Sequence, residues 1–297
     1  MTGVAFIGLG NMGGPMAANL LRAGLEVRGF DLSSESCATA KGEGVVIAAS
    51  AKEAAAGAEV VITMLPAGRH VVAVWEDVLK SAPAGALFID CSTVDVESAR
   101  KAHGLAAAAG MASLDAPVSG GTVGAKGASL TFMAGGSDDA FARAKPVLEK
   151  MGKRVIHCGE AGAGQAAKIC NNMILGISMI GISEAFVLAE KLGLSHQALF
   201  DVASTSSGSC WALTTHCPVP GPVPASAANR DYLPGFATEL MLKDLRLAQQ
   251  AALASGASTP LGAEAAALYG LFQAAGNGGL DYSGIIQFLR GQKKQDA

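Results

Sequence analysis

The chain has little charge and few aromatic side chains. Of its 297 residues, 16% are Asp, Glu, Lys or Arg, and 5% are Phe, Trp or Tyr. The formal net charge is −3 and no block of basic residues occurs, which argues against a nucleic-acid partner. Hydrophobic residues make up 50% of the chain, so much of it must be buried, and the length favours two domains.

Patterns of metal and hydrolase chemistry are also missing. The cysteines show no C-x-x-C spacing, the histidines are scattered without an H-E-x-x-H motif, and no G-x-S-x-G motif occurs. We therefore expect no metal site. The cysteines are expected to be reduced, mostly buried thiols of a cytoplasmic protein. The first predicted strand begins at Thr2 or Gly3, which leaves no room for a signal or transit segment.

The first 31 residues instead carry a dinucleotide-binding pattern. The apolar residues 4–7 predict a buried strand, an apolar helical pattern covers residues 15–21, and residues 26–30 predict a second strand. A G-x-G-x-x-G sequence stands between the first strand and the helix, formed by Gly8, Leu9, Gly10, Asn11, Met12 and Gly13. The motif predicts a dinucleotide site in this strand–turn–helix context, whereas elsewhere it would be an ordinary glycine-rich loop.

Each glycine of this motif has a separate task. Gly8 permits the tight turn, Gly10 lets a pyrophosphate approach the backbone, and Gly13 lets the helix pack on the strand. The helix N-terminus offers unpaired N–H groups to the phosphates. Asp31, after the second strand, can accept hydrogen bonds from both ribose hydroxyls and would repel a 2′-phosphate. The cofactor predicted from these features is NAD rather than NADP.

Strand and helix patterns alternate through the first half, which predicts a parallel sheet covered by helices on both faces. Further strands are expected at residues 45–47, 60–64, 87–90, 111–115, 130–134 and 155–158. Helices are expected at residues 50–56, 69–80, 97–110 and 137–150. Residues 1–163 are therefore expected to form an NAD-binding domain with an α/β Rossmann-type doubly wound sheet.

Residues 164–297 are expected to form an all-α domain for substrate binding and oligomerisation, because strand patterns stop after Gly164. Residues 165–192 form one long, mostly apolar helical pattern that other helices must cover, from the same chain or from a second subunit. Its longest uncharged part, residues 169–183, is too short to span a bilayer. Further helices are expected at residues 196–204, 238–255, 259–274 and 284–290, with an exposed proline-rich loop at 217–224.

Ligands of a doubly wound sheet bind beyond the carboxyl ends of its strands, which directs attention to two loops. Pro66 would form a rigid apolar wall for a nicotinamide ring, or would simply end a strand. Ser119, Gly120 and Gly121 would present a hydroxyl and successive N–H groups to a small anion, or would form a flexible turn.

Two lysines on the predicted helices are candidates for function. Lys168 and Asn172 are four residues apart near the start of the long helix, so both lie on one face. Lys168 is either a surface lysine at a helix end or a buried functional one, and burial favours the uncharged amine that accepts a proton. Lys243 and Asp244, on a later helix, would by themselves be a solvated charged pair.

Taken together, these residues resemble the β-hydroxyacid dehydrogenase family over essentially the whole chain. Four ordered motifs carry the resemblance: FIGLGNMGGPMA at residues 6–17, DAPVSGG at 115–121, GAGQAAKICNN at 162–172 and KDL at 243–245. The resemblance implies an oxidoreductase that transfers a hydride from a small hydroxy acid to NAD.

The same resemblance implies a role for each candidate residue. Lys168 would be the catalytic acid/base. The substrate would be held by Ser119, Gly120, Gly121, Asn172, Trp211, Phe236 and Asp244. Beyond the glycine loop and Asp31, the cofactor would be bordered by Leu65, Pro66, Thr93 and Lys243, with His70 as a weaker candidate.

Within the family, residues 206–213, the proline-rich loop and residues 232–236 resemble members that oxidise 3-hydroxyisobutyrate in valine catabolism. The alternatives are a member that reduces tartronate semialdehyde, another short β-hydroxyacid dehydrogenase, an imine reductase, or a dinucleotide-binding protein without turnover. Lys168 argues against the last two. The partners expected are a small 3-hydroxy acid and further copies of the chain, as a homodimer or homotetramer, with no nucleic acid and no membrane.

Overall fold

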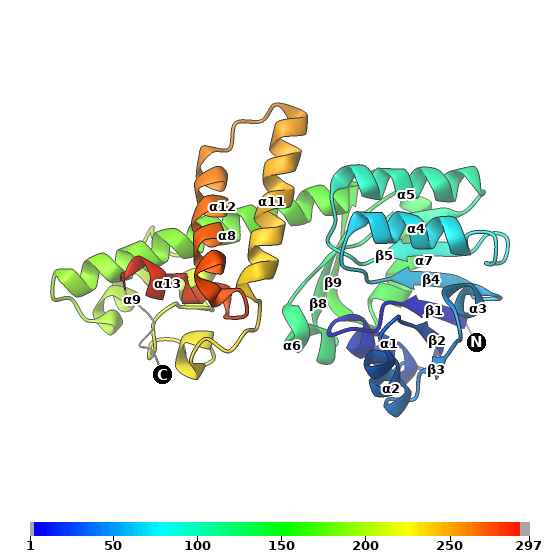
Figure 1. Ribbon diagram of the computed structural model, residues 1–297, viewed down its shortest axis with the longest axis horizontal. Helices are drawn as coiled ribbons and strands as arrows, with labels where there is room; N and C mark the ends of the chain where they lie inside the picture. The colour runs from blue at the N-terminus through cyan, green and yellow to red at the C-terminus, as the bar shows by residue number, and fades with distance from the viewer. Residues whose placement is uncertain (1–2, 292–297) are drawn as a thin grey trace. The chain divides into compact units, whose positions relative to one another are not determined.

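The computed structural model describes residues 3–291. Their contacts divide the chain into two compact units, with the division between Lys168 and Ile169. The first unit is a sheet covered by helices and the second is helical (Figure 1), which confirms the predicted fold class.

The sheet unit is built as the alternating pattern predicts. Its strands are β1 (Gly3–Ile7), β2 (Glu26–Phe30), β3 (Val46–Ile47), β4 (Val60–Thr63), β5 (Leu87–Asp90), β6 (Ala112–Asp115), β7 (Val118–Ser119), β8 (Leu130–Gly135) and β9 (Gly152–Gly159). Its helices are α1 (Gly13–Arg22), α2 (Ser34–Gly42), α3 (Ala51–Ala55), α4 (Gly68–Val78), α5 (Val96–Ala108), α6 (Gly121–Lys126) and α7 (Asp138–Leu148). Side chains that accept a hydrogen bond from a first-turn N–H cap four of these helices: Ser33, Ser50, Asp95 and Ser137.

The strand order places the dinucleotide loop at the point where the order of successive strands in the sheet reverses. The order is β3-β2-β1-β4-β5-β6-β8-β7, and β9 pairs with β8. From β1 the chain builds outward through β2 and β3, and then returns to place β4 on the other side of β1. Ligands of open α/β sheets bind at this switch point, beyond the carboxyl ends of the strands.

Alternate residues of each central strand enter opposite cores. In β1, Val4 and Phe6 pack with residues of α1, α2 and α7, whereas Ala5 and Ile7 pack with residues of α3, α4 and α5. Both faces are apolar because helices cover both of them, which explains the nearly continuous hydrophobic strands.

The sheet departs from the prediction beyond β6. β8 runs antiparallel to β6 and β7, so the sheet is mixed rather than wholly parallel. Three elements were also not predicted: α2, β7 and α6. Helix α2 buries only Ala40, and β7 has two residues, so neither carries a clear periodic pattern of apolar side chains.

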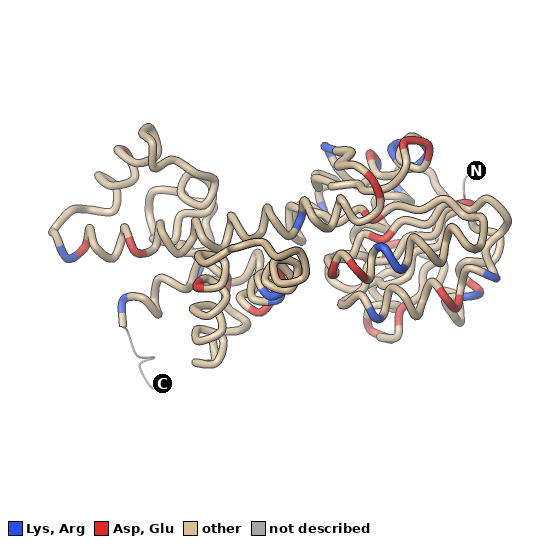
Figure 2. Tube along the Cα trace, turned by 90° about the horizontal axis from the view of Figure 1, so that it is seen from above, with Lys and Arg blue, Asp and Glu red and all other residues tan. Residues whose placement is uncertain are grey.

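The helical unit contains most of one long helix and several shorter ones. Its elements are α8 (Ala163–Lys191), whose first turns belong to the sheet unit, α9 (His196–Thr205), α10 (Trp211–Thr214), η1 (Ala227–Arg230), α11 (Thr238–Ser255), α12 (Pro260–Phe272), η2 (Gln273–Asn277), η3 (Tyr282–Gly284) and α13 (Ile285–Leu289). Charged residues are sparse along this unit, as the long tan stretches of the tube in Figure 2 show.

Helix α8 is the longest element of the chain. Its 29 residues are long and apolar enough to cross a membrane by length and composition alone, a test that the core helix of a soluble protein also passes. Met179 and Ile180 of α8 pack with side chains of α11, α12 and α13. Phe186, nearly two turns further along α8, packs with residues of the 217–232 segment.

The proline-rich segment is only in part the exposed loop that the sequence predicts. Cys217, Pro218 and Val219 are buried, whereas residues 220–224 are partly or fully exposed. Tyr232 donates a hydrogen bond from its hydroxyl to the backbone O of Pro218, at 2.8 Å. A proline has no N–H group to satisfy, so burying this backbone leaves fewer polar groups without partners.

The cysteines are free, but the prediction that most are buried is wrong. Only Cys91 and Cys217 are buried, whereas Cys37, Cys158 and Cys210 are partly exposed and Cys170 is exposed.

Candidate active site

The turn between β1 and α1 excludes side chains at two of its glycines and leaves space over the third. Gly8 has a φ of +96°, and a Cβ there would lie 2.2 Å from the backbone O of Met64. A Cβ on Gly13 would lie 1.8 Å from the O of Gly8. At the exposed Gly10, by contrast, a Cβ would meet no described atom within 4 Å. This arrangement fits a pyrophosphate that approaches the backbone at Gly10 and the N-terminus of α1.

Asp31 lies directly after β2 and is bonded to the same turn. Its Oδ2 accepts a hydrogen bond from the backbone N of Leu9 at 2.6 Å, and its Oδ1 accepts one from Ser33 at 2.8 Å. Each carboxylate oxygen can accept a second hydrogen bond, so the ribose hydroxyls of NAD still have acceptors here. The negative charge would repel a 2′-phosphate at this position.

A buried carboxyl group joins the loops that follow β4 and β5. Asp90 Oδ1 accepts hydrogen bonds from Thr63 Oγ1 at 2.7 Å and from Ser92 Oγ at 2.6 Å. Ser92 Oγ in turn accepts a hydrogen bond from the backbone N of Leu65 at 2.7 Å. Burial raises the pKa of Asp90 to about 6, although the hydrogen bonds from Ser92 and Thr63 lower it. These bonds fix the backbone at Leu65, next to Pro66, where the cofactor is expected.

Ser119, Gly120 and Gly121 form a defined strand-to-helix turn. Ser119 ends β7, where it pairs with Thr131 of β8. Gly120 and Gly121 have φ values of +128° and +58°, in the left-handed region that favours glycine, and Gly121 is the first residue of α6. Ser119 and Gly121 are partly buried and Gly120 is exposed. The turn therefore offers one hydroxyl and one exposed stretch of backbone.

Asp115, at the end of β6, accepts hydrogen bonds from the backbone at the start of α8. Asp115 Oδ1 accepts a hydrogen bond from the backbone N of Gly162, and Oδ2 accepts one from that of Gln165, both at 2.8 Å. His103 Nε2 lies 2.9 Å from the same Oδ1, and Ser113 Oγ lies 2.8 Å from His103 Nδ1. Because the carboxylate only accepts, Nε2 must carry the proton. A carboxylate at a helix N-terminus also interacts favourably with the helix dipole.

Gln165 ties the same turn of α8 to the loop after β5. Its Nε2 donates to the backbone O of Ser92 at 2.7 Å, and its Oε1 accepts from the backbone N of Val94 at 3.1 Å. These two bonds bracket Thr93, a predicted cofactor residue. Lys168 lies three residues beyond Gln165 and is 6% exposed, so the predicted acid/base is a buried lysine in a fixed part of α8.

The helical unit brings three of the other candidates together. Asn172, 2% exposed, lies one turn beyond Lys168 on α8 and donates from Nδ2 to Asp244 Oδ2. The Nζ of Lys243 lies 3.4 Å from the other carboxylate oxygen of Asp244. Asp244 is buried, so the interpretation of Lys243 and Asp244 as a solvated pair is wrong for the aspartate. The amide of Asn172 keeps a second N–H with which it can donate to a ligand.

The remaining candidates are aromatic or lie apart from these groups. Trp211, on α10, is 55% exposed, and Phe236, just before α11, is partly buried. His70 lies in the first turn of α4, four residues beyond Pro66. Among residues 3–291, no cluster of three or more His, Cys, Asp or Glu side chains that could hold a metal ion is found.

Sequence reasoning did not single out the side chains that hold these candidates in place, namely Asp90, Asp115, His103 and Gln165. Asp90 and Asp115 each end an apolar strand, and a carboxylate at that position was a usable signal. His103 gave no signal, because a lone histidine on a helix is common and its partner is 12 residues away in sequence.

Comparisons with known proteins agree with a sheet unit followed by a helical unit. The NAD-binding domain of 6-phosphogluconate dehydrogenase matches residues 3–159, and the NAD-binding domain of NADP-dependent 3-hydroxyisobutyrate dehydrogenase matches residues 162–289. A 3-hydroxyisobutyrate dehydrogenase from Pseudomonas aeruginosa is 50% identical, over 98% of this chain and 100% of that protein. An NAD-dependent L-serine dehydrogenase from the same organism is 46% identical, over 97% of this chain and 98% of that protein.

A solved structure is similar over the same length. The structure of Mycobacterium tuberculosis 3-hydroxyisobutyrate dehydrogenase with L-serine is 56% identical, with a TM-score of 0.95, and covers 98% of this chain and 99% of that chain. The chain belongs to the β-hydroxyacid dehydrogenase family. It is an NAD-dependent oxidoreductase, as the sequence predicts.

One family description names NADP, whereas a relative over nearly the full chain is named NAD-dependent. Asp31 stands at the glycine loop and is bonded to Leu9, which is why we expect its carboxylate to favour NAD.

We predict that Asp31→Ser combined with Leu32→Arg moves the preference towards NADP. Leu32 is 94% exposed, so an arginine there displaces no packed side chain and can pair with a 2′-phosphate. The ratio of kcat/KM with NAD to that with NADP should fall by about tenfold or more, since a hydrogen bond to a charged group contributes about 1.5–3 kcal/mol. Leu32→Arg alone is the control. Efficient use of NADP by the wild type would contradict this role of Asp31.

Proposed function

We propose that this dehydrogenase oxidises (S)-3-hydroxyisobutyrate to methylmalonate semialdehyde with NAD, a step of valine catabolism. The observation that carries the proposal is the full-length similarity to 3-hydroxyisobutyrate dehydrogenases, at 50% and 56% identity. The buried lysine and amide on successive turns of α8 support it, because they supply the proton acceptor and the donor that such a substrate requires.

Bound NAD would supply a nicotinamide ring that accepts the hydride from the carbon bearing the hydroxyl group. We propose that Lys168 accepts the hydroxyl proton at Nζ as that C–H bond breaks, and returns it in the reverse reaction. Burial of Lys168 supports this role, because a proton acceptor must be held against the substrate and away from bulk water.

The substrate carboxylate needs hydrogen-bond donors and its methyl branch needs an apolar wall. We propose that Asn172 and the turn from Ser119 to Gly121 donate to the carboxylate. The hydrogen bond from Asn172 to Asp244 supports this, because it sets which way the amide faces. Trp211 and Phe236 would form the apolar wall.

L-Serine is the second candidate substrate, and two of the relatives favour it. One is an NAD-dependent L-serine dehydrogenase, and the solved structure contains L-serine. L-Serine is also a 3-hydroxy acid, with an ammonium group where 3-hydroxyisobutyrate has its methyl group. An apolar wall of Trp211 and Phe236 would favour the methyl group, because an ammonium there would lose its water.

A substrate panel with NAD tests this assignment. We predict that kcat/KM for (S)-3-hydroxyisobutyrate exceeds that for 3-hydroxypropionate by roughly 10- to 200-fold, since one methyl group in an apolar pocket is worth about 1–3 kcal/mol. L-Serine and glycerate should be slower than 3-hydroxyisobutyrate. A higher kcat/KM on L-serine would favour the second candidate, and a higher value on glycerate with NAD, or on tartronate semialdehyde with NADH, would reject both.

Removing the proposed acid/base should slow the chemistry without weakening the cofactor complex. Lys168→Ala should lower kcat by about 10²- to 10⁴-fold, the usual contribution of positioned acid–base catalysis, with the Kd for NAD unchanged. Lys191→Ala, which removes an exposed lysine at the other end of α8, serves as the control. Turnover that survives in Lys168→Ala would remove this residue from the mechanism.

We further propose a homodimer or homotetramer. Ile174 and Leu188 of α8 are 63% and 59% exposed in the single chain, and apolar side chains of a long helix are usually covered in the assembly. Light scattering on the eluted peak of a sizing column should give a mass of two or four chains. A mass of one chain at working concentration would refute the proposal.

The domain roles and the compartment are proposals as well. Residues 1–163 would bind NAD and residues 164–297 would contribute substrate and subunit contacts, which the family matches to residues 3–159 and 162–289 support. Six free cysteines support a reducing, cytoplasmic environment.

A further inference from the structure

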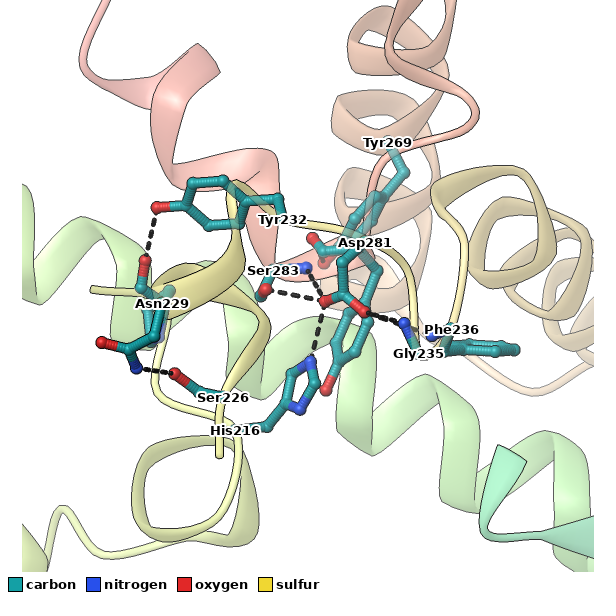
Figure 3. A network of polar contacts seen from close by, with 11 residues as sticks. His216, Ser226, Asn229, Tyr232, Gly235, Phe236, Tyr269, Asp281 and Ser283 are labelled. Atoms are coloured by element: carbon teal, nitrogen blue, oxygen red, sulfur yellow. Dashed lines mark hydrogen bonds and ion pairs between the residues drawn. The ribbon is translucent and has the colours of Figure 1, made fainter. Parts of the chain in front are cut away.

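The buried carboxylate of Asp281 is the centre of one network of polar contacts in the helical unit, as Figure 3 shows. Asp281 is 0% exposed. Its Oδ1 accepts hydrogen bonds from His216 Nε2 at 2.7 Å, Ser283 Oγ at 2.7 Å and Ser283 N at 3.0 Å. Its Oδ2 accepts from the backbone N of Gly235 at 3.0 Å and of Phe236 at 3.1 Å. The proposed chemistry assigns no role to Asp281, His216 or Ser283, so it leaves this network unexplained.

Backbone hydrogen bonds join the same two chain segments. The N of Asp281 donates to the O of Tyr232 at 2.9 Å, and the N of Tyr282 donates to the O of Phe236 at 3.0 Å. The backbone N of Thr238 donates to the O of Leu280 at 2.8 Å. The position of Phe236 is therefore set on both sides by the Asp281 segment.

Trp211 is connected to the same carboxylate through the imidazole ring of His216. The His216 ring stacks on the indole of Trp211, with centroids 5.7 Å apart and planes 12° apart. It also stacks on the ring of Tyr282, with centroids 5.2 Å apart and planes 8° apart. Trp211 is more than half exposed and begins a helix of only four residues, so this stack is a major constraint on its ring.

The ring of Phe236 meets the same stack. It packs edge-on against Tyr282, with centroids 5.8 Å apart and planes 69° apart. Asp281 thus fixes the backbone of Phe236 directly and the indole of Trp211 through His216. These are the two aromatic side chains proposed to form the apolar wall for the substrate branch.

The carboxylate is well suited to this task because it stays ionised. Burial opposes its charge, but the hydrogen bonds from His216 and Ser283 lower the pKa of Asp281 below its ordinary value. Hydrogen bonds to an ionised acceptor are roughly twice as strong as neutral ones. The His216 ring is therefore held firmly at the centre of the stack.

We propose that His216 and Asp281 are positioning residues that set the preference of this enzyme for a branched substrate, by holding Trp211 and Phe236 in place. The inference rests on the proposed function, because it takes these two aromatic side chains to face the substrate branch. Neither residue is proposed to touch the reacting atoms.

Two variants of His216 test separately its hydrogen bond to Asp281 and its stacking on Trp211. His216→Phe keeps a ring that can stack on Trp211 and Tyr282 but cannot donate to Asp281, whereas His216→Gln keeps an N–H donor but removes the stacked ring. The wild-type ratio of kcat/KM for 3-hydroxyisobutyrate to that for 3-hydroxypropionate is expected to be roughly 10 to 200. If both the hydrogen bond and the stacking are needed, each variant lowers this ratio by about fivefold or more. The loss should appear mainly in KM for the branched substrate, with the Kd for NAD unchanged.

Ser283→Ala is the matched control. It removes one donor from the same oxygen of Asp281, but serine has no ring that could stack on Trp211 or Phe236. This variant should keep the wild-type ratio. It also measures how much of any loss comes from a weakened Asp281 network in general.

Acrylamide quenching of tryptophan fluorescence gives a readout that does not depend on substrate. The chain has two tryptophans, and Trp75 is 1% exposed, so quenching reports Trp211. Quenching should increase in His216→Gln, because the indole loses its stacked neighbour, and should stay unchanged in Ser283→Ala.

The double variant with Trp211→Ala shows whether His216 acts through the indole. In the Trp211→Ala background, His216→Gln should lower the substrate ratio by no more than a further twofold or so, since the side chain it positions is already gone. A full additional loss in that background, or an unchanged ratio in both single His216 variants, would overturn the inference. A wild type with no preference for the branched substrate would instead contradict the proposed function, before any variant is compared.

Discussion

The rest of the site depends on the hydrogen bonds that Asp115 accepts from the start of α8. Three donors meet this one buried carboxylate: the N–H groups of Gly162 and Gln165, and the imidazole of His103. The approach is close enough that side chains are excluded nearby. A Cβ on Gly164 would lie 2.2 Å from the O of Met133, and a Cβ on Gly135 would lie 2.6 Å from Asp115 Oδ1. The start of a 29-residue helix is thereby locked to the carboxyl end of the sheet, where a doubly wound fold binds its ligands.

These hydrogen bonds explain why the first turns of α8 belong to the sheet unit although most of the helix belongs to the helical unit. The division between the units falls between Lys168 and Ile169, inside an unbroken helix. Lys168 belongs with the sheet, because Asp115 and Gln165 hold the turns that carry it. Asn172, one turn later, belongs with the helical unit and is held there by Asp244. Two further buried carboxylates repeat the principle: Asp90 fixes the loops beside the predicted NAD site, and Asp281 fixes two aromatic side chains. The turn that carries Lys168 is thus held by Asp115, and the backbone of Phe236 by Asp281, and no step of the reaction is assigned to either acid.

The sequence predicted the elements whose signals are local. The glycine loop, its flanking strands and Asp31 occur as expected, and α11 has the predicted bounds because its apolar periodicity is regular and a glycine ends it. The sequence could not predict the antiparallel pairing of β8, since strand direction depends on contacts distant in the chain. Helix α6 was missed because it is six residues long and begins at a glycine with positive φ. The buried start of the proline-rich segment accepts a hydrogen bond from Tyr232, which lies 14 residues beyond Pro218. The Asp281 network joins residues up to 65 positions apart. Roles for Lys168, Trp211 and Phe236 came from family resemblance rather than from any local pattern.

Amide hydrogen exchange in Asp115→Asn, combined with steady-state kinetics, tests the central claim most directly. An asparagine can accept through only one of its two side-chain atoms, so at least one of the three donors would face an NH₂ group instead of an acceptor. Ser113→Ala is the control, because it removes the hydrogen bond to His103 while leaving the bonds from Asp115 to α8 in place. The account predicts faster exchange across residues 162–168 and a kcat lower by about tenfold or more, the loss of one charged hydrogen bond of about 1.5–3 kcal/mol, with the Kd for NAD unchanged. Wild-type exchange in this segment, or a wild-type kcat despite faster exchange, would contradict it.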